Sequence, residues 1–131
     1  MLEIIGPPPD RPAPMVRRVR LAAWAATCLI GLASVVPGDF EWRTGAPSEL
    51  EHFVAYASAG GLFGFAYMRR WLVIAAAVLI SGACALELVQ IFVPGRTPRL
   101  LDALVSSGGA LVGLAAGAYL RRTATEAKRG D

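Results

Sequence analysis

Side chains that can exchange protons or bind ions occur in this chain at the edges of strongly apolar sequence. Glu87 and Gln90 stand near the end of one apolar run, and Asp102 stands at the start of the next. Arg96 lies in the Pro-Gly turn between these runs, and His52 opens an earlier run. A charge at the centre of a bilayer helix costs roughly 3 kcal/mol or more, so such residues are rare there and usually functional. Together, these groups are able to bind an anion, hydrogen-bond a polar ligand or transfer a proton.

Four apolar runs must position these side chains, namely residues 19–36, 52–68, 71–93 and 100–120. A helix needs about 20 residues to cross a hydrocarbon core of ~30 Å, which the last two runs provide. The first two are slightly short and would use flanking residues or thin the bilayer locally. The chain of 131 residues is 55% apolar, more than an ordinary small soluble domain. We predict an all-α integral membrane bundle of four transmembrane helices; a soluble bundle of unusually apolar helices is the alternative.

Basic residues are divided unequally between the two sides of such a bundle. Of the 13 Lys and Arg residues, ten lie before or at the start of the first run, between the second and third, or after the fourth. Arg43, Arg96 and Arg99 lie on the other side. The positive-inside rule therefore places both termini in the cytoplasm. The net charge of +3 then reflects topology and contact with anionic lipid, and we expect no nucleic-acid partner.

The segments outside the apolar runs predict no soluble domain. Residues 1–18 contain GPPPDRPAP and predict a disordered cytoplasmic leader. Residues 19–120 form the predicted membrane domain, and residues 121–131 a polar cytoplasmic tail that frays. Residues 21–36 have small side chains near their end, as a cleavable signal peptide would. The long leader and long apolar run favour an uncleaved first span.

The predicted topology brings polar residues from three helices to one depth near the outer face. His52 starts the second helix there, and Asp102 starts the fourth. Glu87 lies roughly 10 Å below the turn that contains Arg96, at 1.5 Å of helix rise per residue. Gln90 lies between them in depth and on the same helix face as Glu87. We expect His52, Glu87, Gln90 and Asp102, with Arg96 above them, to line one ligand-binding site in the outer leaflet.

Each of these residues also has a structural explanation. Asp102 would complement the dipole of its helix, and Gln90 would hydrogen-bond a neighbouring helix. Arg96 would contact lipid phosphates, and His52 would be solvated at the interface. Glu87 is the hardest to explain in this way, because a lone carboxylate at its depth must protonate or find a partner.

Glycines at four-residue spacing predict close packing between membrane helices. We expect the inner half of the bundle to be tightly packed through these positions and the outer half to be polar. The glycines are Gly60 and Gly64 in the second run, and Gly109, Gly113 and Gly117 in the fourth.

No sequence pattern implies a cofactor. Cys28 and Cys84 lie inside apolar runs without a nearby Cys or His at metal-ligand spacing, so we predict that both are core residues. No glycine-rich loop follows a strand, which excludes the common nucleotide-binding motifs. We therefore expect neither a nucleotide nor a haem, and no metal.

Two blocks of the chain, EHFVAYASAGGLFGF at 51–65 and ELVQIFVPGRTPRLLDALVSSGGALVG at 87–113, share a pattern with known sequences. They resemble the VanZ-like family of small bacterial membrane proteins, in its H-F-x-A-Y stretch and its E-x-x-Q, P-G-R and D motif. With the spacing of the four runs, the resemblance extends from the first helix to Gly117. It implies a multi-pass protein of the bacterial cytoplasmic (inner) membrane.

The residues that match the family pattern are the polar ones already singled out, His52, Glu87, Gln90, Arg96 and Asp102. The family is named for a role in resistance to a glycopeptide antibiotic, and its molecular activity is not established. The chain departs from this pattern in two places. Ser48 and Glu49 stand where members often have Asp-Lys, and Ser106 stands where they often have Asn. If those family residues take part in the site, the activity of this chain is altered or absent.

Three functions fit this sequence. We favour a binding or remodelling protein whose outer-leaflet pocket recognises a lipid, a lipid carrier or a cell-envelope glycan, with a role in envelope or antibiotic tolerance. A membrane-embedded acid-base enzyme acting on a lipid-linked substrate is the second, although no nucleophile motif is present. A small transporter, or an assembly partner of another membrane protein or of further copies of this chain, is the third. The chain shows no inverted repeat or broken helix of the kind that transporters use.

Overall fold

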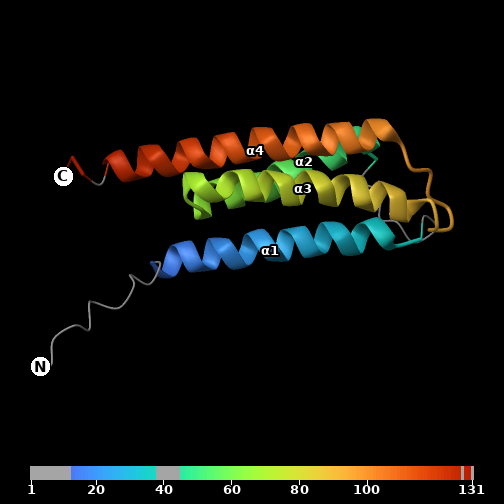
Figure 1. Cartoon of the computed structure of the whole chain (residues 1–131), viewed down its shortest axis with the longest axis horizontal. Coiled ribbons are helices and arrows are strands. Elements are labelled where there is room, and N and C mark those ends of the chain that lie inside the picture. The colour runs from blue at the N-terminus through green and yellow to red at the C-terminus, as the bar shows by residue number, and fades with distance from the viewer. Residues whose placement is uncertain (1–12, 38–44, 128, 131) are drawn as a thin grey trace, which may run out of the picture.

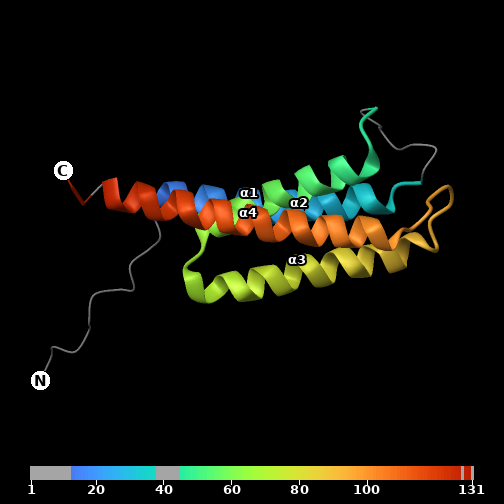
Figure 2. The same cartoon turned by 90° about the horizontal axis from the view of Figure 1, so that it is seen from above.

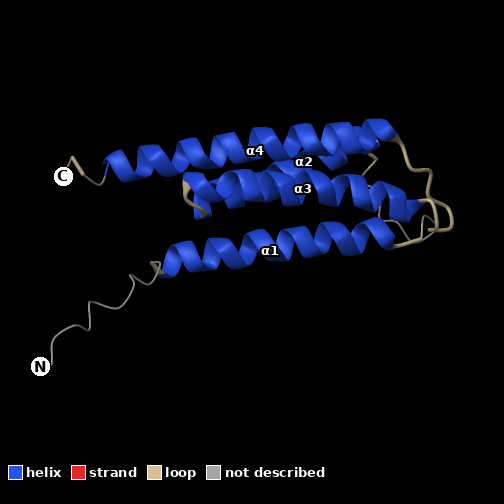
Figure 3. Ribbon diagram, viewed as in Figure 1, coloured by secondary structure: helices blue, strands red, loops and turns tan. Residues whose placement is uncertain are grey.

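The computed structural model describes residues 13–37, 45–127 and 129–130, and all regular structure within them is helical (Figure 3). The four helices are α1 (Pro14–Val35), α2 (Ser48–Ala66), α3 (Arg69–Gln90) and α4 (Leu100–Ala127). They run side by side along the long axis, each reversing the direction of the one before (Figure 1). The prediction of an all-α chain with four helices is confirmed.

The alternating directions give the bundle two chemically different ends. We call the end where α1 begins and α4 finishes the terminal end, and the opposite end the loop end (Figure 1). The link between α2 and α3 lies at the terminal end, while the other two connections lie at the loop end. Seen from above, α2 is tilted, so its first turns diverge from α1 and α4 at the loop end (Figure 2).

Three of the described helices, α1, α3 and α4, are long and apolar enough to cross a membrane. The fourth, α2, has 19 residues, carries Glu49, Glu51 and His52 near its start, and is not one of these three. Large apolar side chains cover the outside of the other helices, for example Leu21, Val73 and Leu111. A soluble protein rarely exposes so much continuous apolar surface. These features indicate a membrane protein.

Both ends of the helical region extend further than the sequence predicts. α1 starts at Pro14, inside the predicted leader of residues 1–18, because proline suits the first turn of a helix. Residues 1–12 of that leader lie outside the described part of the chain. α4 continues to Ala127, so most of the predicted tail of residues 121–131 is helical. An ion pair between Arg122 and Glu126, one helical turn apart, supports this extension.

The predicted glycine positions lie where α2 meets α4, the most extensive helix contact in the bundle. A Cβ atom added at Gly60 or Gly64 would strike the backbone of α4, and one at Gly113 or Gly117 would strike the backbone of α2. Only the absence of a side chain allows such a close approach. This contact sets the distance between the helices that carry His52 and Asp102.

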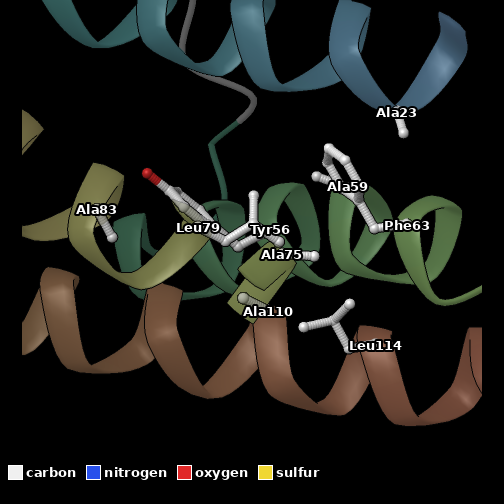
Figure 4. Packing of buried hydrophobic residues seen from close by; sticks show 9 residues of the cluster. All are labelled: Ala23, Tyr56, Ala59, Phe63, Ala75, Leu79, Ala83, Ala110 and Leu114. Carbon is white, nitrogen blue, oxygen red and sulfur yellow. The ribbon is translucent and has the colours of Figure 1, made fainter. Parts of the chain in front are cut away.

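The apolar core is centred on α2, which contributes Tyr56, Ala59 and Phe63 (Figure 4). In Figure 4, Leu79 of α3 and Leu114 of α4 approach these residues from two further directions. Small alanines fill the remaining positions, so helix backbones lie close together. Among the described residues, α1 packs against α2 and α3 but not against α4.

The first helix is fastened at the terminal end by polar contacts with the end of α2. The Arg20 Nε atom donates to the carbonyl oxygen of Ala66 over 3.3 Å. The Trp24 indole nitrogen donates to the Tyr67 hydroxyl over 3.0 Å, and the Arg20 guanidinium stacks over the Tyr67 ring. Such contacts stabilise a helix that buries little apolar surface of its own.

The prediction that Cys28 and Cys84 are core residues is wrong, because both thiols are exposed on the outside of the bundle. The error has a physical cause. Lipid-facing positions of a membrane helix are as apolar as buried ones, so an apolar neighbourhood in the sequence does not identify the buried face.

Candidate functional site

A cavity of about 490 Å³ lies at the loop end, between α1, α2 and α3, with Ser106 of α4 contributing to its wall. Its size falls within the range of small-molecule sites, about 300–1,000 Å³. The α1 side is mainly apolar, with Leu29, Ile30 and Ala33. The opposite side carries polar groups. The predicted site residues that line the cavity are His52, Glu87, Gln90 and Arg96.

Three of the predicted residues come together although each stands on a different helix. His52 of α2, Glu87 of α3 and Asp102 of α4 each present one nitrogen or oxygen atom, and these atoms all lie within 4.8 Å of one another. His52 and Glu87 also line the cavity, whereas Asp102 lies behind them and is buried. We call these three residues the His-Glu-Asp cluster.

Glu87 is held in place by the start of α4. Its Oε2 atom accepts a hydrogen bond from the backbone N–H of Arg99, the residue that directly precedes this helix, over 2.9 Å. Backbone N–H groups at a helix start have no partner within the helix and carry partial positive charge, so a carboxylate is favourable there. The contact therefore fixes α3 relative to α4 at the depth of the cluster.

A second contact of Arg99 joins the same turn to α2. Its Nη1 atom lies 2.7 Å from Oε1 of Glu49 in the first turn of that helix. A hydrogen bond from its own backbone amide, together with the nearby Arg99 guanidinium, holds the pKa of Glu49 below its ordinary value. Because Glu49 is partly exposed, this pair contributes little to stability. It does bring the start of α2, and with it His52, toward the turn before α4.

Asp102 is unusual because it is buried without a complete set of partners. The residue is 6% exposed. Its Oδ1 atom is enclosed and has no hydrogen-bond partner in the described part of the chain. An unsatisfied buried acceptor costs about 1–3 kcal/mol, and more if it is charged, so it calls for a specific explanation. The favourable dipole at the start of α4 offsets only part of this cost.

Gln90 and Arg96 both bind the end of α1. For Gln90 this is the hydrogen bond to a neighbouring helix that the sequence analysis gave as its structural explanation; for Arg96 the contact was not predicted. Gln90 donates from Nε2 to the backbone carbonyl of Ser34 over 3.2 Å. Arg96 donates from Nε to the carbonyl of Val36 over 3.1 Å, and from Nη2 to that of Ala33 over 2.8 Å. The last carbonyls of a helix lack partners within it, and cations are favourable there. These two side chains therefore fasten the end of α1 over the cavity.

Ser106 is a site residue that the sequence analysis noted only as a departure from the family pattern. It is 2% exposed, lines the cavity, and places Oγ 3.4 Å from Nδ1 of His52. Its position four residues after Asp102, on the same helix face, was the available signal. Tyr56 and Glu51 also line the cavity and were not predicted.

Comparison of the chain with protein-family models, with curated proteins and with solved structures gave no match. The site geometry is therefore the basis for the functional argument. An amphipathic cavity with an imidazole, carboxylates, an amide and a guanidinium in its wall suits a ligand that has both a polar group and an apolar chain.

Proposed function

We propose that this chain is a VanZ-like protein of the bacterial cytoplasmic membrane that binds the polar group of a lipid or a lipid-linked envelope precursor at the loop end. The proposal includes four membrane crossings and cytoplasmic termini. Basic residues gather where the helices reach the terminal end, which fits a cytoplasmic position. They are Arg17, Arg18 and Arg20 near the start of α1, Arg69 and Arg70 at the start of α3, and Arg121 and Arg122 near the end of α4. The loop end, and with it the cavity, would then face outward.

Connectivity supports the fourth crossing. α1 ends at the loop end and α3 starts at the terminal end, so α2 connects the two ends of the bundle and would cross a membrane together with them. Its link to α3 consists only of Tyr67 and Met68, which leaves no length for a detour. α2 presents less surface to lipid than the other helices, because its glycine face packs against α4.

The observation that carries the proposal is the two-sided chemistry of the cavity. The apolar α1 wall suits acyl or polyprenyl carbons, and the cationic Arg96 stands beside the polar wall. A guanidinium pairs well with phosphate or carboxylate oxygens. His52 and Glu87 would hydrogen-bond hydroxyl, amide or amine groups of the same ligand.

Binding of defined lipids to the purified full chain tests the proposal. Native mass spectrometry in detergent would compare a polyprenyl phosphate with phosphatidylglycerol, which separates a lipid carrier from a bulk membrane lipid. We expect Glu87→Gln to weaken binding of the preferred lipid at least tenfold, while Glu126→Gln at the terminal end has no effect. If the wild type and Glu87→Gln each retain the two lipids to the same extent, the cavity is not a specific lipid site.

An acid-base enzyme is the second candidate, because the Ser106 hydroxyl lies beside the His52 imidazole and near two carboxylates. This grouping has the elements of a nucleophile, a base and an orienting acid. Hydrolysis of a lipid-linked phosphate or ester by purified protein, lost in Ser106→Ala, would favour it. If Ser106→Ala binds the lipid normally and the wild type releases no product, the binding function stands alone.

A further inference from the structure

The His-Glu-Asp cluster has the composition of a metal site. We propose that His52, Glu87 and Asp102 bind one divalent transition-metal ion, with Zn²⁺ as the expected occupant. One ligand atom from each residue lies within 4.8 Å of the others. Ligand atoms around one zinc ion are about 3.4 Å apart for bonds of about 2.1 Å, so small side-chain rotations would close the cluster around an ion.

The second observation is the enclosed Oδ1 atom of Asp102, which has no hydrogen-bond partner among the described residues. Asp102 is only 6% exposed, so it is 94% buried, and its carboxylate is part of the cluster. A cation bound between the three residues supplies the missing partner. The favourable charge at the start of α4 does not supply this partner, because it leaves the Oδ1 atom without a direct contact.

The charges of the cluster also favour a divalent ion. The Glu87 and Asp102 carboxylates are near neighbours in a bundle surrounded by apolar side chains, where two unpaired negative charges repel strongly. A neutral imidazole, two carboxylates and a divalent cation sum to zero. Glu87 keeps its hydrogen bond from the Arg99 amide in this arrangement, because a carboxylate offers about four acceptor positions.

The ligand types select the class of metal. Calcium and magnesium prefer oxygen ligands alone, whereas an imidazole combined with carboxylates suits zinc and its neighbours in the first transition series. Three protein ligands with a further open position are typical of zinc sites that act on a bound molecule. His52 and Glu87 border the cavity, so an open position would be accessible from it. The residues come from three helices, and for that reason local ligand spacing in the sequence gives no sign of the site.

Metal content and thermal stability of the full chain test this proposal without any lipid ligand. The protein is purified in detergent with its affinity tag removed, stripped with a chelator, and titrated with Zn²⁺, Mn²⁺ or Mg²⁺. We expect one zinc per chain by elemental analysis. At 100-fold excess over Kd, zinc should raise the Tm by about 5–10 °C. Mg²⁺ should produce no comparable shift.

Near-isosteric variants make the test specific. Glu87→Gln and Asp102→Asn should each weaken zinc binding at least tenfold, and their metal-free Tm values report whether they fold. Glu126→Gln, which removes a carboxylate at the terminal end, should bind zinc like the wild type. No zinc-dependent shift in folded wild type, equal binding of Mg²⁺, or equal loss in Glu126→Gln would overturn the assignment. Lipid binding succeeds or fails independently of these results.

Discussion

Gln90 shows how a single side chain serves the fold at the edge of a binding site. The residue is almost fully buried and spans from α3 to the carbonyl of Ser34 on α1. Removing the amide loses one hydrogen bond and leaves a carbonyl unpaired. We expect Gln90→Ala to lower the free energy of unfolding by about 1–2 kcal/mol.

Unfolding of the purified protein in detergent, by heat or by a denaturing detergent, measures this loss. Ser81→Ala on the same helix is the control, because the exposed Ser81 hydroxyl donates to the carbonyl of Val78 in its own helix. It should change stability by less than about 0.5 kcal/mol. Equal effects of the two substitutions would show that the link to α1 contributes nothing.

The residues of the site differ in how well a sequence can place them. His52, Glu87 and Asp102 are placed by helix rise and chain direction alone, which fix their depth, and in the structure they come within 4.8 Å of one another. The contacts of Gln90 and Arg96 with α1 depend on the rotation and tilt of that helix. Nothing in the apolar pattern of α1 fixes either quantity, so the carbonyl partners of these two side chains were not predictable.

At the scale of elements, the glycine contact between α2 and α4 is the rigid part of the bundle. A Cβ atom at Gly113 would meet the backbone of Ala57, while one at Gly108 would have nothing within 4 Å. We expect Gly113→Ala to destabilise the protein by about 1–3 kcal/mol through overpacking. Gly108→Ala should stabilise it by up to about 1 kcal/mol, because alanine favours a helix.

This pair differs only in location, since both variants add one methyl group to the same helix. Thermal unfolding in a single detergent compares them directly. A similar change in Tm for the two variants would mean that α2 and α4 do not approach as closely as the structure has them.

The exposed cysteines show what the sequence leaves open for an element. The lengths of the four helices follow from their apolar runs, to within about one turn at most ends. Which face of a helix meets its neighbours follows only where glycines mark it, as on α2 and α4. On α1 and α3 the apolar residues surround the helix, so Cys28 and Cys84 could not be assigned to the surface beforehand.

At the scale of the whole molecule, the basic terminal end and the polar loop end predict a fixed orientation in the membrane. A single cysteine placed at Gly45 should react with a membrane-impermeant maleimide added to intact cells. One placed at Gly130 should react only after the membrane is opened. Both are introduced into a chain with Cys28→Ala and Cys84→Ala, whose own thiols would otherwise react.

The two labelling positions lie at opposite ends of the bundle. Gly45 precedes α2 at the loop end, and Gly130 follows α4 at the terminal end. Labelling of both positions from outside would mean that the end of the chain is not cytoplasmic, as it would be after an odd number of crossings. Labelling of Gly130→Cys alone would mean that the bundle has the opposite orientation, with the cavity facing the cytoplasm.

The most direct test of the central claim compares two adjacent positions on α2. Ala55 lines the cavity, whereas Val54 is exposed on the outside of the bundle. A small diazirine-bearing amino acid at each position, activated by light in native membranes, captures the lipid beside it for mass spectrometry. We predict that position 55 captures one enriched phosphate-bearing lipid, and that position 54 captures lipids in proportion to the membrane composition. The same unselective lipid profile at both positions would contradict a specific ligand site at the loop end.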